Sequence, residues 1–274
     1  MNDGYLRTLN DFESLCETAI NLSNSTQGRE VDTWREEYAS YIFSKVCLTT
    51  MSILKLLPES SLYTKINNFD VWDISSVCTL ARSLIETFFV FYYVAIDEAD
   101  KDELDFRFIL WHYHEKCERI KMLELIGSNN HQQIEELKLR KNKLKEDLLK
   151  NTFFQKLKSE NYKDFKDISK GKIGVFLNNS AISEKAGISL NYYKAVYKYL
   201  SNYTHTYPLS VSVLFKFNAE DNESKLLFNA VIDYCTGFLS LAIRNFVRIF
   251  PDQVLSKEMN DLISDWENIV KNVC

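Results

Sequence analysis

The stretch VCTLARSLIETFFVFYYVAI, residues 77–96, is the most apolar part of this 274-residue chain. The two charges in it, Arg82 and Glu86, stand four residues apart. On an α-helix this spacing places two side chains on one face, so the charges would meet in surroundings otherwise built for burial. A charge there is costly unless it is paired or used in function. We therefore expect a central buried helix that carries either a structural ion pair or part of a functional site.

The same stretch is long enough to span a bilayer, which takes about 20 apolar residues. Its two charges and its three hydroxyl side chains disfavour an unsupported membrane span. Residues 1–7 have neither a basic nor an apolar segment of the kind that begins a secretory signal. The six cysteines are scattered without a Cys-x-x-Cys pair, which is typical of reduced core thiols. We expect a cytoplasmic protein without a membrane partner.

The composition favours an all-α fold. The chain has 46% hydrophobic and 26% charged residues but only 7 Gly and 3 Pro, so turns are few and regular elements must be long. Apolar residues recur at the helical period over residues 2–24, 29–57, 70–96 and 102–126, and Gly127 suits the end of the last of these helices. These four helices predict an antiparallel bundle within a single domain, residues 1–274.

Residues 130–189 differ in character and are expected to form a protruding basic arm and loop within this domain. One helix is predicted over residues 130–157, where leucines and Ile134 follow a heptad but Lys141 falls on the apolar seam. A charged edge helix of the bundle would have the same pattern. Residues 161–189 read as a loop, and further helices are expected over 190–206, 224–250 and 253–273. Residues 209–217 alternate like a strand and are predicted to be a short extended segment or a continuation of the preceding helix.

The net charge of −5 is unevenly distributed. Residues 138–172 hold twelve basic and five acidic side chains, a net of +7, which leaves −12 for the rest of the chain. Such an asymmetry indicates either a surface for RNA or another phosphate-bearing partner, or an ordinary solvated helical face.

A tyrosine-rich segment, residues 192–208, ends in the single histidine His205 before Pro208. A histidine titrates near neutral pH and can move a proton in phosphodiester or acyl chemistry. If His205 faced Arg82 and Glu86, the three would combine a base, an anion-stabilising cation and an orienting carboxylate. The alternative is a histidine that hydrogen-bonds a carbonyl or a tyrosine at a helix end. The predicted catalytic residues are Arg82, Glu86 and His205, and the predicted substrate-binding residues are Tyr199, Ser201 and Asn202.

The pairing of ARSLIE, residues 81–86, with YLSNYTH, residues 199–205, resembles an uncharacterised bacterial group of HEPN-like helical proteins. The resemblance covers about residues 70–208. It implies an α-helical bundle, a homodimer and a metal-independent endoribonuclease of toxin–antitoxin or phage-defence systems, which act with a partner protein. The superfamily motif is an Arg followed four to six residues later by His, with a polar residue directly after the Arg.

This chain departs from that motif, because Tyr199, Leu200 and Ser201 stand where the Arg before His205 would be. Arg82 could replace it from another helix. Arg107 and His112 have the required separation and are the second choice, although an apolar Phe108 follows Arg107. No third residue completes a metal site around the nearby histidines, and neither a phosphate-binding glycine motif nor a nucleophile signature is present. We expect no metal and no other cofactor.

Two functions remain open from the sequence. One is an RNA-cleaving effector in stress or phage defence. The other is a noncatalytic helical interaction or scaffold module in which Arg82 and Glu86 are a buried structural pair.

Overall fold

The computed structural model describes residues 3–65, 70–216 and 222–272. These residues form twelve α-helices and one short π-helix, and no strand occurs among them. The predicted all-α fold is confirmed. The described residues divide into two compact units, one of residues 1–97 and 179–274 and the other of residues 98–178. The predicted arm, residues 130–189, thus has different bounds from the second unit.

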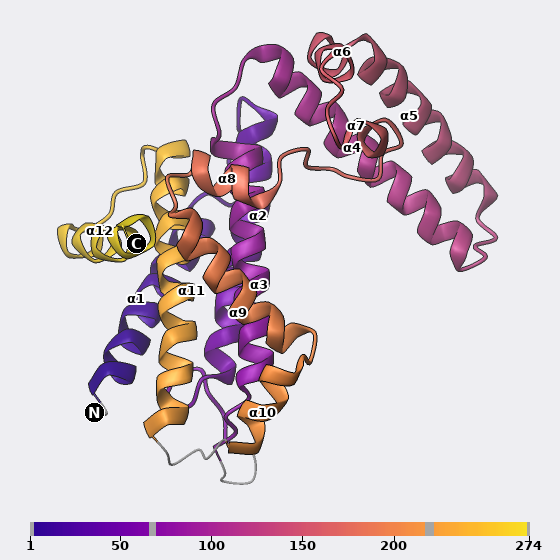
Figure 1. The fold of residues 1–274 in the computed structure, drawn as a ribbon. Helices are drawn as coiled ribbons and strands as arrows, with labels where there is room; N and C mark the ends of the chain where they lie inside the picture. The colour runs from indigo at the N-terminus through magenta and orange to yellow at the C-terminus, as the bar shows by residue number, and fades with distance from the viewer. Residues whose placement is uncertain (1–2, 66–69, 217–221, 273–274) are drawn as a thin grey trace. The chain divides into compact units, whose positions relative to one another are not determined.

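The first unit is a helical bundle (Figure 1). It comprises α1 (Asp3–Ser25), α2 (Trp34–Leu56), α3 (Ile74–Phe91), α8 (Asn179–Lys185), α9 (Leu190–Thr204), α10 (Pro208–Lys216), α11 (Asn222–Ile249) and α12 (Lys257–Asn272). Helix α3 packs against α2, α9 and α11, so it is the centre of the bundle. Most of its apolar residues are buried, as the sequence predicts.

Local signals set the ends of α3. The side chain of Asp73 caps the helix by accepting a hydrogen bond from the Ser76 amide at 3.0 Å. The helix widens at its other end into a π-helix, Tyr92–Ile96, which the sequence did not reveal. Arg35 of α2 donates hydrogen bonds to the carbonyls of Val94 and Asp97 at 3.0 and 2.8 Å, and so holds this end against α2.

Two stretches in the first unit, Ile74–Ile96 and Ser224–Ile249, are long and apolar enough to cross a membrane. Over half of the most apolar window is buried in each, 56% and 67% respectively. Core helices of soluble proteins pass the same test of length and composition. Five cysteines lie in the described residues, all as free thiols, and Cys274 lies outside them.

The second unit comprises α4 (Lys101–Leu125), α5 (His131–Lys150), α6 (Thr152–Ser159) and α7 (Phe165–Ser169). Helix α4 ends where predicted, with Gly127 at a φ of 63°. The single helix predicted over residues 130–157 is wrong, because Asn151 adopts an extended conformation and caps α6 by accepting from the Phe154 amide at 2.9 Å. Leu148 and Ile134 of the predicted heptad are buried within this unit.

Other boundaries differ for equally local reasons. The second helix begins at Trp34 rather than at residue 29, because Thr33 and Glu36 form a capping box there. Pro208 does not merely end a helix but begins α10, where its missing N–H costs nothing. The segment 209–217 therefore continues as helix up to Lys216, and Phe217 lies outside the described residues.

A carboxylate, Asp233, is enclosed where α11 meets α1. Its Oδ2 accepts a hydrogen bond from Asn229 at 3.2 Å, and the Thr8 hydroxyl also bonds to it. Burial, opposed by the Thr8 hydrogen bond and reinforced by the charge of Asp11, raises the pKa of Asp233 from 3.8 to about 6. The folded chain therefore holds a proton on Asp233 at pH values where the unfolded chain has lost it.

This raised pKa predicts a stability that falls as pH rises from about 4 to 6 and then stays level. Asp233→Asn, which keeps the group neutral, should match wild type near pH 4 and exceed it at pH 7.5 by about 1–2 kcal/mol after allowance for partial exposure. Urea unfolding followed by circular dichroism at both pH values measures this. Asp261→Asn on the exposed face of α12 is the control. An equal difference at both pH values for Asp233→Asn would contradict the prediction.

Candidate functional site

The charged pair lies on the face of α3 that meets α9. The neighbouring Ala81, Leu84 and Ile85 are buried, whereas the side chains of Arg82 and Glu86 are 17% and 43% exposed. Arg82 Nε donates to Glu86 Oε1 at 3.0 Å, so the two residues meet as their spacing predicts. The pair thus lies at the margin of the core and is not sealed inside it.

Helix α9 brings two further groups to this pair. Ser189 caps the start of α9 through the Tyr192 amide, and the helix continues to Thr204, with His205 as its C-cap residue. Tyr197, Ser201 and His205 follow one another at intervals of four and so share a helix face. The packing of α9 on α3 aims this face at Arg82.

The end of α9 fixes the position of His205. Thr206 adopts a left-handed conformation with a φ of 53°, and the Tyr207 amide donates to the Asn202 carbonyl at 2.9 Å. This is the Schellman arrangement that ends many helices, although glycine is the usual residue at the left-handed position. Pro208 follows at once as the first residue of α10. His205 is therefore held at an exposed helix end.

All three nitrogens of the Arg82 guanidinium are engaged. Nε bonds to Glu86, Nη1 lies 3.0 Å from His205 Nε2, and Nη2 donates to the Tyr197 hydroxyl at 2.6 Å. The Tyr197 hydroxyl in turn donates to Glu86 Oε1 at 3.1 Å. The guanidinium carbon also lies 4.6 Å from the centroid of the Tyr197 ring, a cation–π contact.

These contacts assign the proton on His205. An arginine side chain can only donate, so the 3.0 Å contact requires His205 Nε2 to accept. The imidazole is then neutral, with its proton on Nδ1. This tautomer leaves the basic lone pair on the nitrogen that faces Arg82.

Arg82, Glu86, Tyr197 and His205 form one cluster. The charges of this cluster reinforce its hydrogen bonds. Burial lowers the pKa of Arg82, but the hydrogen bond and charge of Glu86, together with Tyr197, outweigh burial and raise it above its usual value. Burial and the charge of Glu86 raise the pKa of the Tyr197 phenol, against the opposing charge of Arg82. Arg82 therefore stays a cation and Tyr197 stays a hydrogen-bond donor over the physiological range.

A family model matches residues 36–224, which is more than half of the chain and spans both halves of this cluster. The chain belongs to DUF5677, a family of unknown function. No curated protein and no solved structure matches it.

The predicted substrate-binding residues of this DUF5677 protein lie around the cluster without bonding to Arg82 in the described contacts. The Ser201 hydroxyl donates to the Tyr197 carbonyl at 2.6 Å, and the Asn202 amide donates to the Lys198 carbonyl at 2.7 Å. The hydroxyl of Tyr199 lies 3.4 Å from that of Tyr203, on another face of α9. Ser201 alone of the three shares the face of Tyr197 and His205.

Tyr197 is the member of the cluster that sequence reasoning missed. The signal was present, since Tyr197 stands eight residues before His205 and two helical turns place both on one face. Among six tyrosines in residues 192–207, that spacing could single out Tyr197 only once His205 was known to face Arg82.

The second-choice pair has a structural setting in the second unit. Arg107 is 1% exposed, forms an ion pair with Glu103 and lies 5.8 Å from the centroid of the Phe176 ring. The ring of His112 packs edge-on against Phe108 at 4.4 Å. Burial on this scale makes Arg107 a core cation, which is unsuited to receive a substrate.

The basic segment, residues 138–172, lies entirely in the second unit. Within it, Lys138 and Lys172 form ion pairs of 3.0 Å with Glu135 and Asp167, both at the surface. Among residues 3–65, 70–216 and 222–272, no group of three or more metal-ligating side chains is assembled.

The bridging role of Tyr197 gives a direct test of the cluster. Tyr197→Phe removes the hydroxyl between Arg82 and Glu86 but keeps the ring, so the free energy of unfolding should fall by about 1 kcal/mol. Tyr207→Phe, at a residue that is 51% exposed, is the control and should change it by less than about 0.5 kcal/mol. Urea unfolding of both variants is the measurement. Equal stability of the two variants would show that the Tyr197 hydroxyl does not hold the cluster together.

Proposed function

We propose that this protein is a HEPN-like helical effector, a metal-independent endoribonuclease that acts in the bacterial cytoplasm in stress or phage defence. The observation that carries the proposal is the convergence of Arg82, Glu86 and His205 within hydrogen-bond distance, although 123 residues separate Arg82 from His205. A cation, a base and an orienting carboxylate in contact are the groups that metal-independent phosphodiester cleavage requires.

Each residue has a role in this chemistry. His205 Nε2 takes the proton of a ribose 2′-hydroxyl, and the 2′-oxygen attacks the adjacent phosphorus. The bond from phosphorus to the 5′-oxygen breaks, which leaves a 2′,3′-cyclic phosphate and a 5′-hydroxyl protonated from water. Arg82 stabilises the negative charge that develops on the phosphate oxygens, while Glu86 and Tyr197 hold the guanidinium in place.

Because the cluster residues bond to one another, phosphate binding must be coupled to the release of His205. Phosphate oxygens prefer two parallel N–H donors of a guanidinium, and Nη1 and Nη2 are held by His205 and Tyr197. When Arg82 turns Nη1 to the phosphate, His205 Nε2 loses its partner and becomes available as a base. Substrate binding and release of the base are then one event.

The basic segment 138–172 is the proposed contact to the RNA backbone, through exposed lysines that displace counterions. We also propose a homodimer and a partner protein, such as an antitoxin, as in the superfamily that the sequence resembles.

The activity is tested by substituting the cation and the base. Arg82→Ala and His205→Ala should each lower RNA cleavage by at least 100-fold and relieve growth arrest on expression, because each removes a group needed in the transition state. The measurement is cleavage of a labelled single-stranded RNA in the presence of a chelator, with product ends analysed for cyclic phosphate.

Arg119→Ala is the matched control, since Arg119 is 54% exposed and pairs with Glu115 in the second unit. Circular dichroism checks that each variant folds. Cleavage or toxicity that persists in both Arg82→Ala and His205→Ala would end the ribonuclease proposal.

The rival proposal is a noncatalytic interaction or scaffold module, and one observation favours it. Every nitrogen of the Arg82 guanidinium already has a partner within the chain, as in a structural ion pair that fixes the register of α3 and α9. In that case the cluster would serve the fold, and the partners would bind elsewhere.

A double-mutant cycle separates the two proposals. Had the pair been sealed in the core, Arg82→Met alone would cost about 3–5 kcal/mol. Because Glu86 is 43% exposed, we expect about 1 kcal/mol. Arg82→Met with Glu86→Leu should regain most of that loss, as measured by urea unfolding. A folded double variant that keeps its toxicity supports the scaffold, and one that loses it contradicts the scaffold.

A further inference from the structure

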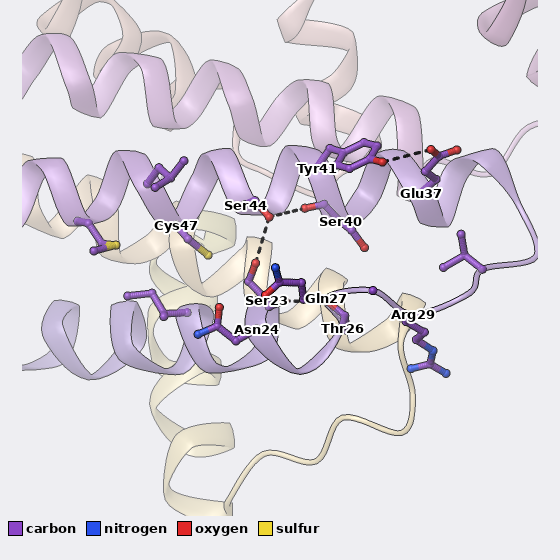
Figure 2. A pocket seen from close by; sticks show the side chains of 15 residues that line it. Ser23, Asn24, Thr26, Gln27, Arg29, Glu37, Ser40, Tyr41, Ser44 and Cys47 are labelled. Carbon is purple, nitrogen blue, oxygen red and sulfur yellow. Dashed lines mark hydrogen bonds between the residues drawn. The ribbon is translucent and has the colours of Figure 1, made fainter.

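A hollow of about 540 Å³ lies between α1 and α2 in the first unit, and none of the four cluster residues lines it (Figure 2). Its volume is within the range of small-molecule sites, about 300–1,000 Å³. Fifteen residues line it, and Arg29 and Glu37 are the charged ones, one of each sign. The lining therefore favours neither a strongly anionic nor a strongly cationic ligand.

One wall carries a fixed aromatic ring. Tyr41 is 64% exposed, yet its hydroxyl donates to Glu37 at 3.3 Å and its ring meets that of Tyr38 edge-on at 6.2 Å. The ring is thus held from two sides while most of its surface is open. With Leu48 and Met51 it offers an apolar surface on which a flat ring can stack.

The floor is made of hydroxyl groups with determined donor roles. Ser44 of α2 donates its hydrogen to the Ser40 carbonyl at 2.9 Å, so in the 3.1 Å contact between the two hydroxyls Ser23 is the donor (Figure 2). The Cys47 thiol also hydrogen-bonds to Ser23, which leaves Ser23 one lone pair to accept from a ligand. Burial raises the pKa of the nearby Cys47 thiol to about 12, so this group stays uncharged.

Unused hydrogen-bonding groups surround this floor. The side chains of Asn24, Gln27 and Ser40 line the hollow and make no hydrogen bond to other parts of the described chain. The two amides supply both donors and acceptors, and the Ser40 hydroxyl supplies one more of each. An open ring face beside a set of donors and acceptors suits a flat molecule with a polar edge.

We infer that the hollow between α1 and α2 binds an uncharged, planar heterocycle of the nucleobase or nucleoside class. The ring stacks on Tyr41, and its polar edge bonds with Ser23, Ser40 and the amides of Asn24 and Gln27. This site is separate from the Arg82 cluster and does not depend on the ribonuclease proposal.

The test compares substitutions of two serines of α2, Ser44 and Ser52. Each donates a hydrogen bond to the carbonyl four residues before it. Ser44 lines the hollow, whereas Ser52 donates to the Leu48 carbonyl at 2.8 Å and does not line it. Adenosine, guanosine, cytidine and uridine are titrated into the full chain by calorimetry and ligand-observed NMR. At least one should bind, and Ser44→Leu should weaken it at least tenfold while Ser52→Leu and Arg82→Ala leave it unchanged.

Asn24→Ala with Gln27→Ala is the second variant, on an exposed rim where folding is not at risk, and it should also weaken binding. The 5′-monophosphate of the bound nucleoside should bind no more tightly than the nucleoside itself. The inference is overturned if none of the four nucleosides binds at millimolar concentration, or if Ser44→Leu and the rim variant bind like wild type.

Discussion

The positive charge of Arg82 at the margin of an apolar helix is the constraint on which the rest of this site depends. A guanidinium can only donate hydrogen bonds and stays charged at any physiological pH, so each of its nitrogens needs an acceptor or water. Glu86 supplies one acceptor from the same helix, and α9 supplies the other two through Tyr197 and His205. The packing of α9 against α3 therefore also brings together the chemical groups of the cluster.

This arrangement ties the candidate site to the core. One face of α3 buries Leu84, Ile85 and Phe88 at the centre of the bundle, while the adjoining face carries the charged pair. At the other side, the left-handed Thr206 and the helix-starting Pro208 fix where α9 ends, and with it the position of His205. Core packing thus sets the geometry that either an active site or a structural ion pair would need.

Features governed by local spacing could be predicted from the sequence. The contact of Arg82 with Glu86 and the turn at Gly127 each depend on a few neighbouring residues, and the structure contains both. Features that depend on distant packing could not. Tyr197 enters the cluster only because α9 lies on α3, and the raised pKa of Asp233 follows from its enclosure by α1.

Some errors arose where a local signal was outweighed. The heptad over residues 130–157 indicated one helix, but an asparagine that both ends α5 and caps α6 divides it. The first of the two compact units joins helices from both ends of the chain, residues 1–97 and 179–274, and no single segment reveals that association. The hollow between α1 and α2 is likewise a product of packing, because its lining comes from two helices and the loop between them.

The central claim is that His205 and Arg82 form a site that opens to an RNA phosphate. Long-range ¹H–¹⁵N NMR of the histidine side chains tests it most directly, with the His205 signals identified by their loss in His205→Ala. The free protein should show His205 with its proton on Nδ1, and a noncleavable 2′-deoxy oligonucleotide should shift the Nε2 resonance as Arg82 turns to the phosphate. An Nε2 resonance that stays unchanged at saturating oligonucleotide would contradict the account.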